Sequence, residues 1–166
     1  QKQRIISTVK NKIIINDSES ADVAELRKSL VTVGYDVRIA ASSKETLNLL
    51  DTFQPNLIIC EARLPEMDGP HLLQEIRKRP ALQRLPFVLT GKLKTLEERV
   101  NIMKLPLDDY WQKPVEAAEA VVRVEMLIKD AELLSASLRP KWRGFNGNLT
   151  GMRSGEHTSE LQSLAY

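Results

Sequence analysis

Five polar residues of this chain are of types that bind anions or metal ions, and each ends or directly follows a short apolar run. They are Asp17, Ser18, Glu61, Thr90 and Lys113. Carboxylates are hard oxygen ligands for a divalent cation, whereas a hydroxyl and an ammonium group donate hydrogen bonds to the oxygens of an anion. The set therefore predicts a site for an anion, with or without a metal ion, if the fold brings the ends of the runs together.

Short β-branched runs alternate with longer amphipathic stretches between residues 12 and 137. The predicted strands are 12–16, 36–40, 56–60, 86–90 and 108–112, and the predicted helices are about 23–33, 43–50, 69–79, 96–104 and 115–137. Continuously apolar strands separated by helices favour an α/β fold, a five-stranded parallel sheet with helices on both faces, as in flavodoxin-like proteins. Such sheets bind ligands outside the carboxyl ends of their strands, where the five polar residues lie.

Composition limits the classes of protein to be considered. The chain has 166 residues and is 42% hydrophobic, which suffices for one buried core. Cys60 is the single cysteine, so a disulfide framework and a multi-cysteine metal site are excluded, and a cytoplasmic location is expected. No apolar run is long enough to span a membrane. Basic residues without acids gather in 1–12 and 139–153, and we expect these flanks to be solvated rather than to bind nucleic acid.

One run carries a specific resemblance. Residues 56–69 are Asn-Leu-Ile-Ile-Cys-Glu-Ala-Arg-Leu-Pro-Glu-Met-Asp-Gly. This run resembles the third strand and following loop of bacterial response-regulator (CheY-like) receiver domains, where an apolar strand ends in Asp and Leu-Pro-x-Met-Asp-Gly follows. Here the loop matches, but the position of the phosphate-accepting aspartate holds Glu61. The resemblance extends over residues 12 to about 135.

The resemblance assigns a role to each of the polar residues. It implies that Asp17 and Glu61 would hold Mg²⁺, together with a second acid that Ser18 replaces here. It also implies that Thr90 and Lys113 would bind the phosphoryl oxygens and that the Lys–Pro bond at 113–114 is cis. Finally, it implies that Thr90 and Tyr110 form the switch that reports phosphorylation to partners.

Two departures from the family pattern lie in the metal and acceptor positions. Ser18 supplies less charge than a carboxylate, so we expect Mg²⁺ binding to be possible but weak. Glu61 extends its carboxylate by roughly 1.5 Å beyond that of an aspartate. A misplacement of about 1 Å can slow a positioned reaction about a hundredfold, so we expect negligible phosphoryl transfer. Two side chains could compensate, since Arg63 could fill part of the vacated space and Glu19 could act as a substitute ligand.

The sequence therefore predicts the receiver module of a two-component or phosphorelay regulator, one that is a pseudo-receiver and not an enzyme. Its Glu61 either mimics the activated state permanently or leaves an inert docking scaffold. One alternative is a receiver that retains residual acyl-phosphate chemistry. Another is a small flavodoxin-like enzyme or nucleotide-binding protein. No Gly-rich loop follows 12–16, and the acidic segment 16–19 would repel a nucleotide.

The receiver resemblance implies several kinds of partner. The partners are a histidine kinase or another signalling protein, a downstream domain of the same chain, and a second copy bound through the apolar last helix.

The chain is expected to divide into four segments. Residues 1–11 form a basic flank, and 12–137 form the receiver-like domain. Residues 138–152 are expected to be a linker and the truncated start of a second domain, since 145–151 resembles the opening strand of PATAN-type domains. Residues 153–166 resemble a translated sequencing adapter, so we expect a non-native tail.

Overall fold

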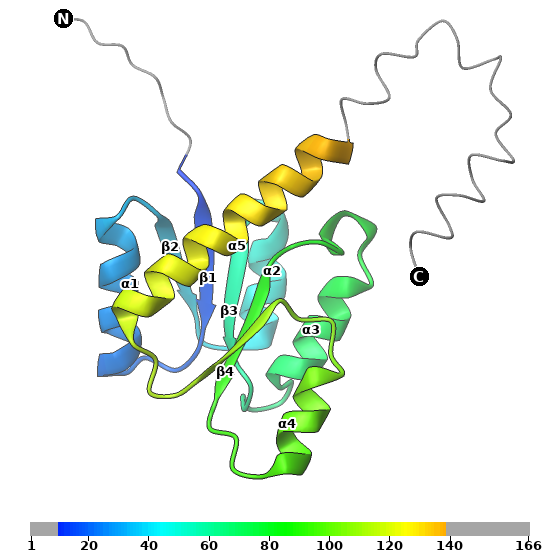
Figure 1. Ribbon diagram of the computed structural model, residues 1–166. Coiled ribbons are helices and arrows are strands. Elements are labelled where there is room, and N and C mark those ends of the chain that lie inside the picture. The colour runs from blue at the N-terminus through cyan, green and yellow to red at the C-terminus, as the bar shows by residue number, and fades with distance from the viewer. Residues whose placement is uncertain (1–9, 139–166) are drawn as a thin grey trace, which may run out of the picture. The chain divides into compact units, whose positions relative to one another are not determined.

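The computed structural model describes residues 10–138 of the chain (Figure 1). The predictions on residues before 10 and after 138, namely most of the basic flank, the PATAN-type start and the tail, lie outside the described residues. The chain divides into two compact units, 1–131 and 132–166, and of the second unit the structure describes the end of the last helix. In the described part, no helix is long and apolar enough to cross a lipid bilayer.

Strands and helices alternate along the first unit. The elements are β1 (Lys12–Asn16), α1 (Ala21–Thr32), β2 (Asp36–Ala40), α2 (Ser43–Phe53), β3 (Leu57–Glu61), α3 (Gly69–Arg77), the 3₁₀ helix η1 (Pro80–Leu82), β4 (Phe87–Gly91), α4 (Leu96–Met103), β5 (Asp109–Gln112) and α5 (Ala117–Leu138). The strands form one parallel sheet in the order β2-β1-β3-β4-β5. This confirms the predicted fold class.

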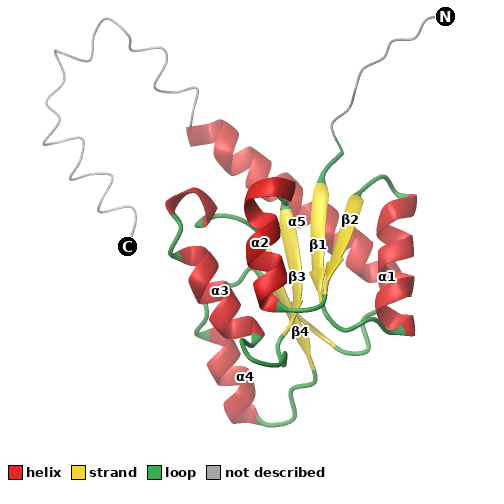
Figure 2. Cartoon of the chain, turned by 180° about the vertical axis from the view of Figure 1, so that it is seen from behind, coloured by secondary structure: helices red, strands yellow, loops and turns green. Residues whose placement is uncertain are grey.

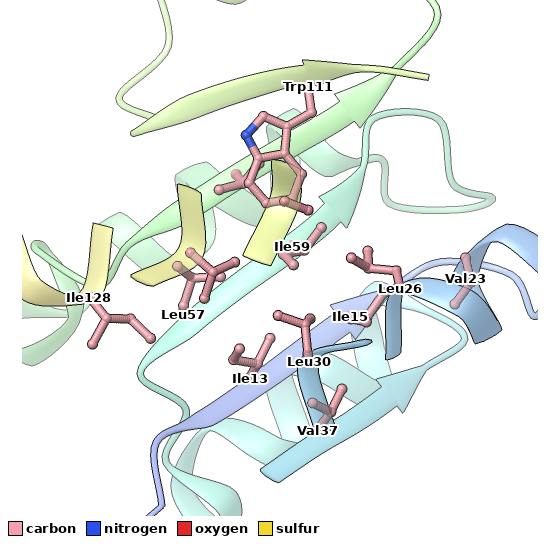
Figure 3. Close-up of a cluster of buried hydrophobic side chains, with 13 residues drawn as sticks. Ile13, Ile15, Val23, Leu26, Leu30, Val37, Leu57, Ile59, Trp111 and Ile128 are labelled. Carbon is pink, nitrogen blue, oxygen red and sulfur yellow. The ribbon is translucent and has the colours of Figure 1, made fainter. Parts of the chain in front are cut away.

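Each face of the sheet is covered by helices (Figures 1 and 2), which explains why the central strands β1, β3 and β4 are largely apolar. On one face, α1 and α5 pack over the sheet, with Leu26, Leu30 and Ile128 in one buried cluster with residues of β1 and β3 (Figure 3). On the other face, α2 and α3 cover it with side chains such as Phe53 and Leu72. Alternate residues of each strand therefore serve opposite cores, as period-two geometry requires.

Helix starts follow from local capping. Ser20, Ser42, Asp68 and Thr95 are the N-caps of α1, α2, α3 and α4, and each side chain accepts a hydrogen bond from the backbone N–H three residues on. Thr95 forms a full capping box with Glu98. The predicted end of α3 at 79 was two residues too late, because Pro80 starts the short η1 helix instead of simply terminating α3.

Arg77 fastens the end of α3 to three other segments. Its Nη1 donates to the carbonyl oxygens of Leu82 (2.9 Å) and Leu85 (2.7 Å), and its Nε donates to that of Pro106 (3.0 Å). Its Nη2 lies 3.1 Å from Oδ2 of Asp108, which also accepts the Phe87 N–H at 2.8 Å. Burial lowers the pKa of Arg77 and Asp108 opposes that shift, but the guanidinium remains charged. Arg77 thus links α3 to η1 and to the segments that precede β4 and β5.

The last two helices pack unequally. No side chain of α4 is buried, and Leu96, Val100 and Met103 are exposed. On α5, Val124 and Ile128 are buried against the sheet, whereas Val122 and Met126 are exposed. The apolar band predicted on the last helix is therefore divided between core and surface.

Candidate functional site

The carboxyl ends of β1, β3 and β5 bring three of the predicted residues into direct contact. The Lys113 Nζ lies 2.9 Å from Oδ2 of Asp17 and also forms an ion pair with Oε1 of Glu61. All three side chains are largely shielded, with Asp17 only 9% exposed, Glu61 14% and Lys113 26%. They line a pocket of about 520 Å³ together with Ser18 and with the rim cations Arg63, Lys92 and Lys94.

Every carboxylate oxygen of the two acids already accepts a hydrogen bond. Besides the contacts to Lys113, Oδ1 of Asp17 accepts from the Ser18 N–H at 2.7 Å, and Oε2 of Glu61 accepts from the Arg63 N–H at 2.9 Å. Burial alone would lower the pKa of Lys113, but hydrogen bonds and charge from Glu61 and Asp17 outweigh burial and raise it. The site therefore holds a charged ammonium between two carboxyl groups.

Thr90 and Tyr110 lie beside this ion cluster. Thr90 is 3% exposed at the end of β4, in register with Glu61, and it lines a smaller cavity of about 60 Å³ that shares Asp17 and Lys113 with the pocket. The Tyr110 hydroxyl donates to Oε1 of Gln112 at 3.2 Å. Burial raises the pKa of Tyr110, a hydrogen bond with the Leu93 backbone lowers it in part, and the charge of Glu61 adds to the rise.

Gln112 links β5 to the loop after β4. Its Oε1 accepts the Leu93 N–H at 3.3 Å, and its Nε2 lies 3.5 Å from the Leu93 carbonyl oxygen. A Cβ on Gly91 would lie 3.3 Å from the Tyr110 hydroxyl and 3.7 Å from Oε2 of Glu61, so the glycine leaves room for both groups. Gln112 could not be recognised from the sequence, because an exposed glutamine at the end of a strand carries no distinguishing signal.

Two side chains that could have modified the site point elsewhere. The Arg63 side chain is 78% exposed and pairs with Glu98 at 3.0 Å, so it lies at the rim of the pocket and not in the space next to Glu61. Glu19 is exposed and lines a different groove, beside β2, so this structure does not place it as a substitute ligand. Among residues 10–138, no group of three or more acidic, histidine or cysteine side chains is arranged to hold a metal ion.

The loop between β3 and α3 is held close to the acceptor position. The Gly69 N–H donates to the Ala62 carbonyl at 2.9 Å, and a Cβ at Gly69 would come within 2.7 Å of the Glu61 carbonyl oxygen. Ser43 Oγ donates to the Met67 carbonyl at 2.8 Å, which ties the loop to α2. The Lys113–Pro114 peptide bond on the other side of the site is cis, as the resemblance implied.

Polar groups are also buried just behind the site. Asn16 and Thr46 are both fully buried, and neither the Asn16 amide nor the Thr46 hydroxyl has a hydrogen-bond partner among the described residues. Cys60 is buried, and burial followed by the charges of Glu61 and Asp17 raises the pKa of its thiol far above the usual value. The thiol is therefore protonated and unreactive at neutral pH.

A five-stranded parallel sheet with an acid, a hydroxyl and a lysine at its strand ends defines a receiver-type signalling domain. The model of the response regulator receiver domain matches residues 13–125. The chain belongs to this family. Receiver domains interact with histidine kinases and are often fused to further domains.

Known proteins are similar in sequence and in structure. The alkaline phosphatase synthesis transcriptional regulatory protein PhoP of Bacillus subtilis is 31% identical over 133 residues, 78% of this chain and 53% of that protein. The probable transcriptional regulator ycf27 of Porphyridium aerugineum is 29% identical over 77% of this chain and 52% of that protein. A putative response regulator from Chloroflexus aurantiacus, whose crystal structure is known, has a TM-score of 0.67 and 28% identity, covering 73% of this chain and 99% of that one. The chain spans about half the length of the curated relatives it matches.

Proposed function

We propose that residues 12–137 form a pseudo-receiver, a receiver domain that acts through contacts with other proteins, does not accept a phosphoryl group and is not an enzyme. The observation that carries this proposal is the state of the Glu61 carboxylate. One oxygen is paired with the Lys113 ammonium and the other accepts the Arg63 N–H. A carboxylate bound on both oxygens is a poor nucleophile, because its lone pairs are engaged and its charge is neutralised.

The length of Glu61 adds to this effect. In-line transfer requires the attacking oxygen at a defined distance from phosphorus, and the extra methylene moves that oxygen by roughly 1.5 Å. The same length brings Oε2 of Glu61 close to Gly91, the last residue of β4. Thr90 and Lys113 line one small cavity and are of types that can bind phosphoryl oxygens, so in this proposal the departure from the family is confined to the acceptor and the metal ligands.

Mg²⁺ fits this site poorly. Asp17 and Glu61 would be its ligands, and the ion would supply charge that offsets an incoming phosphoryl group. Both carboxylates are already paired with the ammonium of Lys113, which a cation would have to displace. Ser18 contributes only a neutral hydroxyl, 3.5 Å from Oδ1 of Asp17. We propose that any binding of Mg²⁺ is weak.

The contacts around Tyr110 and Gln112 support a domain held in one state. The loop after β4 is bonded to β5 through Leu93, and Lys113 is paired with both carboxylates of the site. The curated relatives are described as transcriptional regulators, and this chain matches about half of each. We propose that the module presents a fixed surface to a histidine kinase or another signalling protein, and to a further domain of the same protein in the cytoplasm.

The experiment repairs both departures at once. Glu61→Asp restores the acceptor length, and Ser18→Asp restores the missing acid. The double variant, incubated with acetyl phosphate and Mg²⁺, is expected to gain an adduct of one phosphoryl group in intact mass, and the adduct should not form when EDTA is present from the start. Thr90 and Lys113 remain unchanged to bind the phosphoryl oxygens.

Three controls separate the causes. Each single substitution is expected to stay unmodified, since one defect persists in each. The parent chain is also expected to stay unmodified, and an acyl-phosphate on it would show that the domain is an ordinary phosphorylatable receiver. If the double variant stays unmodified, Arg63→Ala in that background tests whether the rim arginine excludes the donor.

A further inference from the structure

The outer edge of β2 presents backbone groups without partners. β2 is the last strand of the sheet, next to β1 (Figure 2). The Asp36 N–H donates to the Asn11 carbonyl, and the Ala40 carbonyl accepts the Asp17 N–H, so residues 36, 38 and 40 bond toward β1. In a parallel strand the intervening residues point the other way. The N–H and C=O groups of Val37 and Ile39 therefore face outward, where no described segment covers them.

A groove runs beside this open edge. It has a volume of about 750 Å³ and lies between the first turns of α1 and β2. Val23, Val37 and Ile39 make its apolar lining, and Arg27 stands on its α1 wall. An added strand would place every second side chain toward this groove, because successive side chains alternate between the two faces of a sheet. The edge thus offers main-chain hydrogen bonds and an apolar site with matching spacing.

The opposite face of the same edge is basic. The Arg38 guanidinium lies over the Phe53 ring, 4.5 Å from its centroid, and the Lys12 ammonium lies 5.8 Å from the same centroid. Arg38 is exposed in the middle of β2. Acidic groups near the edge are Glu19 in the groove and Asp36 at the start of the strand, so cations are in excess. Side chains of an added strand that point to this face would meet Arg38 and Lys12.

We propose that β2 is a docking site for an extended acidic peptide segment of a partner protein, which adds a sixth strand to the sheet. Apolar side chains of the segment enter the groove beside Val37 and Ile39, and the alternate acidic side chains face Arg38 and Lys12. Main-chain hydrogen bonds supply affinity and the side-chain pattern supplies specificity, as in other cases of β-strand addition. A second copy of this chain fits less well, because pairing β2 with β2 would bring two Arg38 side chains together. This proposal does not depend on the state of Glu61.

The test uses the full chain and a fluorescein-labelled heptapeptide of alternating glutamate and valine. Fluorescence anisotropy is expected to show saturable binding at least tenfold tighter than for a heptapeptide of alternating lysine and valine. Arg38→Glu is expected to weaken binding about tenfold or more, whereas the matched reversal Lys28→Glu, on an exposed position of α1 outside the groove, leaves it unchanged. Hydrogen exchange followed by NMR is expected to show slowing at the amides of Val37 and Ile39 on binding.

Other outcomes overturn the proposal. Equal binding of the two peptides, equal binding by Arg38→Glu and Lys28→Glu, or unchanged exchange at both amides would each exclude strand addition by an acidic segment. Ile39→Pro removes one outward N–H without touching a bond to β1, and retained affinity in that folded variant would also contradict the proposal. Sedimentation that shows concentration-dependent dimers lost in Ile39→Pro would assign the edge to a second copy instead.

Discussion

Two shielded cations, Arg77 and Lys113, lie at opposite ends of the sheet and are held in different ways. Arg77 donates mainly to carbonyl oxygens of the backbone, from η1, from the segment before β4 and from the loop before β5. Lys113 pairs with two side-chain carboxylates that line an open pocket. Backbone acceptors carry no net charge and cannot move without unfolding, whereas carboxylates can be protonated, substituted or claimed by a metal ion. The first arrangement fixes the fold and the second decides what the site can bind.

The largest loss of stability is expected when Arg77 is replaced. Arg77→Ala removes four hydrogen bonds and leaves buried carbonyl oxygens without donors, so the free energy of unfolding should fall by about 3 kcal/mol. Urea unfolding followed by circular dichroism measures it. Arg79→Ala is the matched control, since its exposed side chain lies 4.0 Å from Asp51, and it should cost less than about 0.5 kcal/mol. Equal losses of stability in the two variants would show that Arg77 stabilises the fold no more than an exposed arginine does.

A smaller loss of stability is expected when Lys113 is replaced. Lys113→Met leaves Asp17 and Glu61 side by side without a counter-ion, which should cost about 2 kcal/mol at neutral pH. Unlike the loss at Arg77, this one should be recovered by a metal ion, because two unpaired carboxylates attract Mg²⁺. Thermal melts with 0 and about 10 mM Mg²⁺, an order-of-magnitude choice for a weak site, should separate only for the variant. A parent chain that responds equally would mean that Lys113 does not oppose metal binding.

The pH dependence of the Lys113 contribution has a defined sign. The pKa of Lys113 is raised in the folded state, so its contribution is fully present below the ordinary value of 10.5 and is lost as the pH rises through the folded value. The difference in unfolding free energy between the parent and Lys113→Met should therefore be constant near neutrality and shrink in strong alkali. A difference that instead shrank in mild acid would implicate the carboxylates.

A gain of stability is expected where a buried polar group has no partner. Asn16→Val replaces an amide that makes no hydrogen bond in the described structure, at a position that faces the core beneath α2 and α3. Relief of the desolvation cost should raise the free energy of unfolding by about 1 kcal/mol. A loss of stability on the same urea assay would show that Asn16 binds a buried water molecule.

The smallest effect is expected at the rim. Arg63→Ala breaks an ion pair whose arginine side chain is 78% exposed, so stability should change by less than about 0.5 kcal/mol. Glu98 keeps its bonds to the Lys94 and Thr95 N–H groups, so α4 should retain its start. A larger loss would mean that the rim pair holds the two loops together and belongs with Arg77 rather than with the surface.

The fold was predictable because β1, β3 and β4 are largely apolar and because the helix caps are local. β1 and β2 match their predicted ranges, whereas β3 and β4 are shifted one residue toward their carboxyl ends. That shift matters at Glu61, which lies inside β3 and pairs in register with Thr90 instead of following the strand. A run of apolar letters cannot show where hydrogen bonding stops, so a polar last residue is easily left out.

The residues of the site could be predicted from the sequence, but their contacts could not. The strand ends bring Asp17, Glu61 and Lys113 together, as the parallel sheet requires. The orientation of Arg63 toward Glu98 depends on a rotamer and on the position of α4, and neither is written in local sequence. Arg77 was overlooked for a related reason, since its acceptors are carbonyl oxygens, which every residue possesses.

Gly69 gives the acceptor loop a mechanical property. Any side chain there would collide with the Glu61 carbonyl and with Leu89, and its N–H is bonded to Ala62. The first turn of α3 and the backbone that carries Glu61 are therefore packed tightly together at Gly69, so a displacement of one should displace the other. Force applied to α3 by a bound protein would be delivered to the ion cluster, and a repulsion within the cluster would tilt α3.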